Sequence, residues 1–89
     1  MIKSAITISN KLGLHARASA KLTKLAGSFK CDVHMARNGR RVNAKSIMGV
    51  MMLAAGLGTE VEIETEGADE EAAMQAIRQL IEARFGEGE

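Results

Sequence analysis

Residues 13–20 read GLHARASA and mark the place where a loop gives way to the first long helix of the chain. Beyond them, apolar residues recur at helical spacing as far as Phe29, at Ala18, Leu22, Leu25, Ala26 and Phe29 itself. Gly27 is the one break in this run. We therefore predict a helix that begins at or just after His15 and ends near Gly27 and Ser28.

His15 stands at the start of this helix, where the first backbone N–H groups lack helical partners and carry the positive end of the helix dipole. Such a position binds anions and favours neutral imidazole, the nucleophilic form, over imidazolium. Arg17 adds a planar guanidinium suited to phosphate oxygens. The arrangement is typical of a histidine that carries a phosphoryl group, although a lone histidine before a helix is more often a loop or cap residue.

The composition is that of an ordinary globular protein, and the 89 residues predict a single domain, 1–89, with a modest core. The one cysteine, Cys31, excludes an internal disulfide framework and a CxxC motif, and we expect it to be a small buried residue. The sequence has no transmembrane run and no signal-peptide pattern. We expect a cytoplasmic protein without a cofactor or a metal.

Charge is unevenly distributed along the chain, although the net charge is only +1. Residues 1–49 hold ten Lys or Arg residues and one acid, Asp32, whereas residues 50–89 hold two Arg residues and ten acids. If the fold keeps these halves on different surfaces, the surface around His15 is positive and attracts an acidic partner.

Alternation of apolar and polar residues predicts strands at 2–8, 31–35, 40–43 and 60–66. Asn38-Gly39 predicts a two-residue hairpin, because both positions tolerate positive φ, so the second and third strands should pair antiparallel. In the fourth strand, glutamates alternate with Val61, Ile63 and Thr65. We interpret the glutamates as a solvated sheet face rather than as paired catalytic carboxylates.

Ser46 is suited to cap a short helix that contains Gly49 and is apolar almost all round. A helix at the edge of so small a domain cannot bury every side. We therefore expect some of its large apolar side chains to be exposed, among Ile47, Met48, Met51 and Met52. Exposed methionine suits an adaptable docking surface, and burial of all four in the core is the alternative.

Asp69-Glu70-Glu71 suits the first turn of a last helix, and we expect residues 86–89 to fray. Its inward stripe should comprise Ala73, Ile77, Leu80, Ile81 and either Arg84 or Phe85. The elements then follow the order βαββαβα. We predict an α+β open-faced β-sandwich, in which a four-stranded antiparallel sheet carries three helices on one face.

Two segments, GLHAR at 13–17 and KSIMGVM at 45–51, resemble the signatures of the HPr family, and the resemblance covers essentially the whole chain. This family comprises the histidine-containing phosphocarriers of the bacterial phosphoenolpyruvate-dependent sugar phosphotransferase system. The resemblance implies that His15 accepts a phosphoryl group on Nδ1 from enzyme I and passes it to enzyme IIA domains, with Arg17 stabilising the phosphate. The chain would then be a covalent relay rather than an enzyme acting on a small molecule.

One residue departs from the family pattern. Many members have proline after the arginine, whereas this chain has Ala18. Proline stiffens a first helical turn, and alanine restores an N–H and frees the backbone. The departure bears on the rigidity of the site more than on its chemistry.

The resemblance also implies regulation at Ser46. In several members the matching serine is phosphorylated by a bifunctional HPr kinase/phosphorylase. A phosphate there would be stable at the helix start but would add about −1.5 to −2 charges to a surface meant for an acidic partner. Without the resemblance, Ser46 is simply a good helix cap.

Arg17, Lys21 and Lys24 form one stripe of the first helix, which on spacing alone is a solvated face. In the family the corresponding surface and the short second helix dock enzyme I and enzyme IIA. The resemblance thus implies partner contacts at Ala20, Lys21, Lys24, Ile47, Met48 and Met51. We expect a monomer that neither binds nucleic acid nor inserts into a membrane.

Two other functions stay open. One is a regulatory phosphocarrier of the nitrogen-related phosphotransferase branch, although the segment around Ser46 favours the carbon-linked branch. The other is a small α/β domain that handles nucleic acid or metal, which lacks support because the chain has no Tyr or Trp and no CxxC. We interpret His34, in a strand, as a structural or surface residue.

Overall fold

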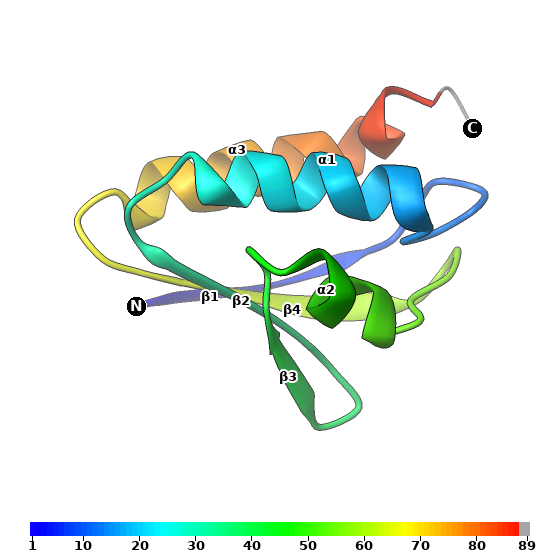
Figure 1. Ribbon diagram of the computed structural model, residues 1–89, viewed down its shortest axis with the longest axis horizontal. Helices are drawn as coiled ribbons and strands as arrows, with labels where there is room; N and C mark the ends of the chain where they lie inside the picture. Colours follow the sequence, from blue (N-terminus) through cyan, green and yellow to red (C-terminus); the bar gives the residue numbers. More distant parts are fainter. Residues whose placement is uncertain (88–89) are drawn as a thin grey trace.

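The alternating segments form one antiparallel sheet of four strands. These are β1 (Ile2–Thr7), β2 (Asp32–Arg37), β3 (Arg40–Asn43) and β4 (Glu60–Glu66). The computed structural model describes residues 1–87. The strand order is β1-β4-β2-β3, so the last strand in the sequence lies between β1 and β2 (Figure 1).

The helical segments are α1 (Ala16–Gly27), α2 (Ile47–Met52) and α3 (Glu70–Glu82), followed by a short 3-10 turn, η1 (Arg84–Gly86). Helices α1 and α3 run side by side across one face of the sheet, and α2 packs beside α1 (Figure 1). The order of elements and the antiparallel pairing confirm the predicted open-faced α+β sandwich. Within residues 1–87, no helix is both long and apolar enough to cross a membrane.

The core lies between the helices and the sheet. Its largest fully buried side chains include Leu22 of α1, Ile77 of α3 and Ile63 of β4. Cys31 is buried, as expected. The sequence left Arg84 and Phe85 as alternatives for the end of the inward stripe, and it is Phe85 that is buried, with 1% of its surface exposed.

The Asn38-Gly39 turn is confirmed. Asn38 has a φ of 50° and Gly39 a φ of 79°, the left-handed conformations that a two-residue hairpin needs. The turn joins β2 and β3, in which Arg37 pairs with Arg40 and His34 with Asn43.

The interpretation of the β4 glutamates as a solvated face is wrong for Glu64. Only 5% of its surface is exposed, and it is paired with two cations, Lys3 of the adjacent β1 and Arg41 of β3, which lies beyond β2. Arg41 Nε donates to Glu64 Oε2 at 2.7 Å, and Lys3 Nζ lies 3.6 Å from Oε1. The hydrogen bond from Arg41 holds the pKa of Glu64 below its usual value. Basic residues of the first half of the chain and acids of the second thus interleave across the sheet, so the two halves do not separate onto different surfaces.

Candidate functional site: the start of helix α1

A tightly held loop delivers His15 to the start of α1. Gly13 has a φ of 65°, and Leu14 N–H donates to the Ala55 carbonyl oxygen at 2.9 Å. Asn10 Nδ2 donates to the Gly13 carbonyl oxygen at 2.8 Å. Ser19 Oγ, in the first turn of α1, donates back to the Leu14 carbonyl oxygen at 3.0 Å. These bonds fix the backbone on both sides of His15.

His15 is the N-cap of α1, as the sequence predicts. Its backbone is extended, with φ −71° and ψ 177°, and its carbonyl oxygen accepts the first helical hydrogen bond from Ser19 N–H at 2.8 Å. Its side chain makes no capping bond. The N–H groups of Ala16, Arg17 and Ala18 precede that first helical bond, so helix geometry gives them no acceptor within α1. An anion beside His15 can accept hydrogen bonds from them.

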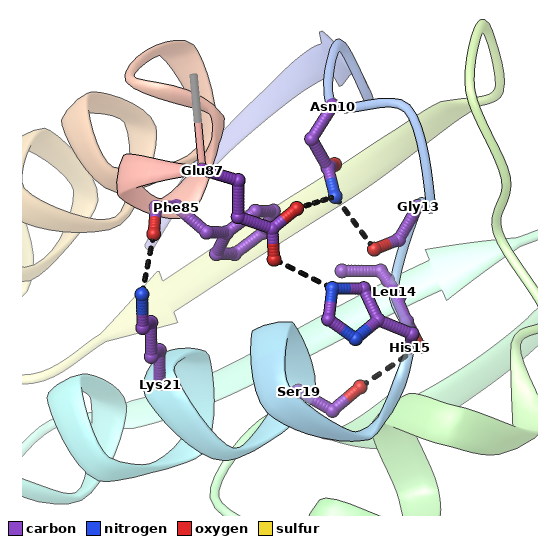
Figure 2. Close-up of polar contacts among 8 residues, drawn as sticks. All are labelled: Asn10, Gly13, Leu14, His15, Ser19, Lys21, Phe85 and Glu87. Carbon is purple, nitrogen blue, oxygen red and sulfur yellow. Dashed lines mark hydrogen bonds and ion pairs between the residues drawn. The ribbon is translucent and has the colours of Figure 1, made fainter. Parts of the chain in front are cut away.

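The imidazole contacts a carboxylate from the far end of the sequence. His15 Nε2 lies 2.5 Å from Glu87 Oε2 (Figure 2). Asn10 Nδ2 donates to the other oxygen, Oε1, at 3.1 Å. The hydrogen bonds from Asn10 and from His15 hold the pKa of Glu87 below its ordinary value, so its carboxylate is ionised near neutral pH.

For residues 86 and 87, this contact corrects the expectation that the C-terminal residues fray. Gly86 closes η1, and Glu87 is part of the site. The turn is anchored by the buried ring of Phe85 and by Lys21, whose Nζ donates to the Phe85 carbonyl oxygen at 2.7 Å (Figure 2). Residues 88 and 89 lie outside the described part of the chain.

An open pocket of about 740 Å³ surrounds the imidazole. Besides His15 and Glu87, its lining includes the basic residues Lys11, Arg17 and Lys21. Three cations around one carboxylate make a site that can hold an anion larger than a single carboxylate. Within residues 1–87, no cluster of three or more His, Cys, Asp or Glu side chains is placed to hold a metal ion.

The structure places the other site residues expected from the sequence as follows. The side chains of Arg17, Ala20, Lys21 and Lys24 are exposed along α1, and Lys21 also hydrogen-bonds the C-terminal turn. Ala18, the departure from the family pattern, is fully buried beneath the first turn. His34 is half-buried in β2, opposite Asn43 and Glu64, and does not join the pocket around His15.

Ser46 is the N-cap of α2, and its hydroxyl accepts from Gly49 N–H at 3.2 Å. The expectation that some apolar side chains of α2 are exposed is confirmed: Met48 is 67% exposed and Met52 57%, with Ile47 and Met51 also exposed. Leu12 and Leu57, which the sequence did not single out, are exposed as well. The Leu14–Ala55 hydrogen bond joins the loop before His15 to the segment that follows α2, and the exposed Leu12 lines the pocket.

Two residues of the site, Asn10 and Glu87, were missed from the sequence. An asparagine side chain in a loop often hydrogen-bonds the nearby backbone, so the sequence did contain a signal by which Asn10 could have been found. Glu87 lies 72 positions from His15 and follows a glycine in a short polar tail. Such a tail is typical of a frayed end, and no spacing rule connects it to the first helix.

Comparisons with known proteins show the family of the chain. Residues 2–83 match the family model described as "PTS HPr component phosphorylation site". The chain is similar to the phosphocarrier protein HPr of Cupriavidus necator, with 66% identity over 89 residues that make up the whole of both chains.

Solved structures of the same family have the same fold. The structure is similar to that of HPr-C-His from Thermoanaerobacter tengcongensis, with a TM-score of 0.95 and 44% identity over 98% of each chain. A second structure from that organism, described as an HPr dimer, gives a TM-score of 0.79 and 44% identity over 98% of this chain and 100% of that one. Since the family model spans residues 2–83 and a full-length relative is 66% identical, the chain belongs to the HPr family, the phosphocarriers of the phosphotransferase system.

Proposed function

We propose that this HPr-family chain carries a phosphoryl group on Nδ1 of His15, accepting it from phosphorylated enzyme I and passing it to enzyme IIA domains in the cytoplasm. The observation that carries the proposal is the position of His15 as N-cap of α1, with its side chain free of any capping bond. That position offers the lone pair of an imidazole nitrogen and, beside it, the anion-binding end of a helix.

The geometry supports the following step. The Nδ1 lone pair attacks phosphorus and forms the N–P bond, while the bond from phosphorus to the donor breaks and its electron pair stays with the donor. The phosphoryl oxygens accept hydrogen bonds from the first N–H groups of α1, and the Arg17 guanidinium, which lines the same pocket, neutralises part of their charge. Transfer to enzyme IIA is the same step in reverse, with the acceptor taking the place of the donor.

Partner docking is assigned to two adjoining surfaces. The exposed face of α1 supplies positive charge through Arg17, Lys21 and Lys24, and the apolar face of α2 supplies Ile47, Met48 and Met51. Ala20, small and exposed on α1, lets a partner approach the helix closely. Acidic partners fit the first surface, and adaptable methionine side chains suit binding to more than one partner.

Ser46 is the proposed regulatory site. It is exposed at the start of α2, and its hydroxyl oxygen accepts a hydrogen bond from Gly49 N–H of that helix. A phosphate there would place about two negative charges at the edge of the apolar docking surface. Phosphorylation by an HPr kinase would thereby weaken the docking of enzyme I.

The test is incubation of the purified protein with enzyme I and phosphoenolpyruvate. We expect one acid-labile phosphoryl group per chain, absent from His15→Ala and present in His34→Ala, which removes the other histidine of the sequence. Uptake by His15→Ala would overturn the proposal.

Offering enzyme I and enzyme IIA proteins of the carbon-linked and the nitrogen-related branches in parallel then identifies the branch. A solution measurement of molecular mass tests the proposed monomer, since one similar structure is described as a dimer.

A further inference from the structure

The carboxylate of Glu87 is oriented before any partner arrives. Asn10 Nδ2 donates both to Glu87 Oε1, at 3.1 Å, and to the Gly13 carbonyl oxygen, at 2.8 Å. The amide of Asn10 is fully buried, and its orientation is fixed by these two acceptors, since the opposite orientation would set its own oxygen against both of them. Asn10 therefore joins the loop that carries His15 to the residue that contacts the imidazole.

The backbone that brings Glu87 to the imidazole adopts an uncommon conformation. Arg84, Phe85 and Gly86 have φ values of 55°, 56° and 75°, in the left-handed region that residues other than glycine rarely occupy. Consecutive left-handed residues persist only where the surroundings hold them, and such strain gathers at functional sites. Here the buried ring of Phe85 and the hydrogen bond from Lys21 to the Phe85 carbonyl oxygen hold the turn. The match to the family model ends at residue 83, so this turn lies outside it.

We propose that Glu87 is a positioning residue for His15: its carboxylate accepts the Nε2–H of the imidazole, which leaves the Nδ1 lone pair for the incoming phosphoryl group. The inference rests on the proposed function and adds to it a residue that the family match does not contain. Figure 2 shows the orientation of the imidazole ring: Nε2 faces Glu87, and the other nitrogen, Nδ1, faces the start of α1. The partner of one imidazole nitrogen sets the chemistry of the other.

Glu87 also contributes after the transfer. When Nδ1 gives its lone pair to phosphorus while Nε2 keeps its proton, the ring gains one unit of positive charge. The carboxylate 2.5 Å from Nε2 stabilises that charge through a charge-assisted hydrogen bond. The other charged groups that line the pocket are Lys11, Arg17 and Lys21, all cations suited to the phosphoryl oxygens rather than to the ring.

The test compares wild-type protein with Glu87→Gln, Glu87→Ala and the control Glu82→Gln, which removes an exposed acid at the end of α3. Glu87→Gln and Glu82→Gln change the net charge equally, so they separate a local role from a general charge effect. Two quantities are measured: the proton NMR signal of His15 Nε2–H in the unphosphorylated, ¹⁵N-labelled protein, and the initial rate of phosphoryl uptake from phosphorylated enzyme I. Thermal melting checks that each variant is folded.

In wild type and Glu82→Gln we expect a visible Nε2–H signal, protected from exchange with water by its acceptor. Glu87→Ala should lose this protection and take up phosphoryl about tenfold more slowly, by analogy with the loss of a carboxylate that orients a metal-ligating histidine. Glu87→Gln keeps an acceptor without the charge, so its rate should fall between those of wild type and Glu87→Ala.

Three results would overturn the inference alone, with His15 still phosphorylated: an Nε2–H signal that does not depend on Glu87, equal uptake rates in all four proteins, or faster uptake by the Glu87 variants. The last would mean that Glu87 acts only by repelling the anionic donor. If the wild-type protein takes up no phosphoryl group, the proposed function fails, and the role of Glu87 in transfer fails with it.

Discussion

Gly13 lies so close to Ala55 that a Cβ atom on Gly13 would stand 2.5 Å from the Ala55 carbonyl oxygen. Gly13 also has a φ of +65°, which disfavours any other residue. We expect Gly13→Ala to lower the free energy of unfolding by about 2–5 kcal/mol, the sum of left-handed strain and overpacking. Urea denaturation measures this loss.

Gly39→Ala is the matched control, because Gly39 has a φ of +79° but open space where the Cβ would lie. It should cost only the backbone strain, about 1–2 kcal/mol. Equal losses in the two variants would show that the contact between Gly13 and Ala55 does not constrain the loop before His15.

Replacement of Ser46 by Asp should slow phosphoryl uptake from enzyme I without unfolding α2. Aspartate is a good N-cap, so it can replace the hydroxyl that accepts from Gly49 N–H, while its charge opposes an acidic partner. The measurement is the initial rate of uptake. Ser46→Asn caps equally well without the charge and should keep the wild-type rate; a similar slowing in both variants would assign the effect to the shape of the cap and not to its charge.

Lys24→Glu should slow association with enzyme I by about fivefold at low salt, because Lys24 lies on the exposed basic face of α1. The difference should disappear near 1 M salt, where the screening length falls to about 3 Å. Lys30→Glu, an identical charge change at an exposed site beyond the end of α1, should have a smaller effect. A rate that does not respond to salt would remove the case for electrostatic attraction.

Glu64 should make the stability of the sheet depend on pH. The Arg41 guanidinium holds the pKa of Glu64 below its ordinary value of 4.5. A carboxylate whose pKa is lowered in the folded protein stabilises the fold at pH values above its ordinary pKa. This contribution is lost as the pH falls through the pKa that the group has in the folded protein. The stability advantage of wild type over Glu64→Gln, measured by urea denaturation, should therefore shrink as the pH falls from about 5 to about 3.

Glu62→Gln provides the comparison, since Glu62 is exposed on the same strand. The difference in the free energy of unfolding between Glu62→Gln and wild type should change less over the same pH range. An advantage over Glu64→Gln that is constant with pH would show that the ion pairs with Arg41 and Lys3 contribute no net stability.

Local patterns predicted most of the fold. Apolar periodicity placed α1, the Asn38-Gly39 pair placed the β2–β3 turn, and Ser46 marked the start of α2. Each of these features depends on neighbours a few residues apart, which is the range over which spacing and capping rules operate. The placement of His15 at a helix start was predictable for the same reason.

The features that were missed depend on contacts between distant parts of the chain. Glu64 is paired with Lys3 of the adjacent β1 and with Arg41 of β3, two strands away, and the strand order that brings both cations to Glu64 is not encoded in the alternation within β4. The contact of Glu87 with His15 requires the left-handed turn at Arg84–Gly86. No local pattern in the sequence encodes either arrangement.

The strand order β1-β4-β2-β3 has a consequence for how the sheet assembles. Strand β1 pairs only with β4 among the described strands, and Ile2 is opposite Thr65 in that pairing. The hairpin of β2 and β3 can form early, because its strands are joined by two residues, whereas β1 must close a loop of more than 50 residues before it gains a hydrogen bond. We expect folding on the millisecond scale or slower, with the β2–β3 hairpin ordered first and β1 added together with β4.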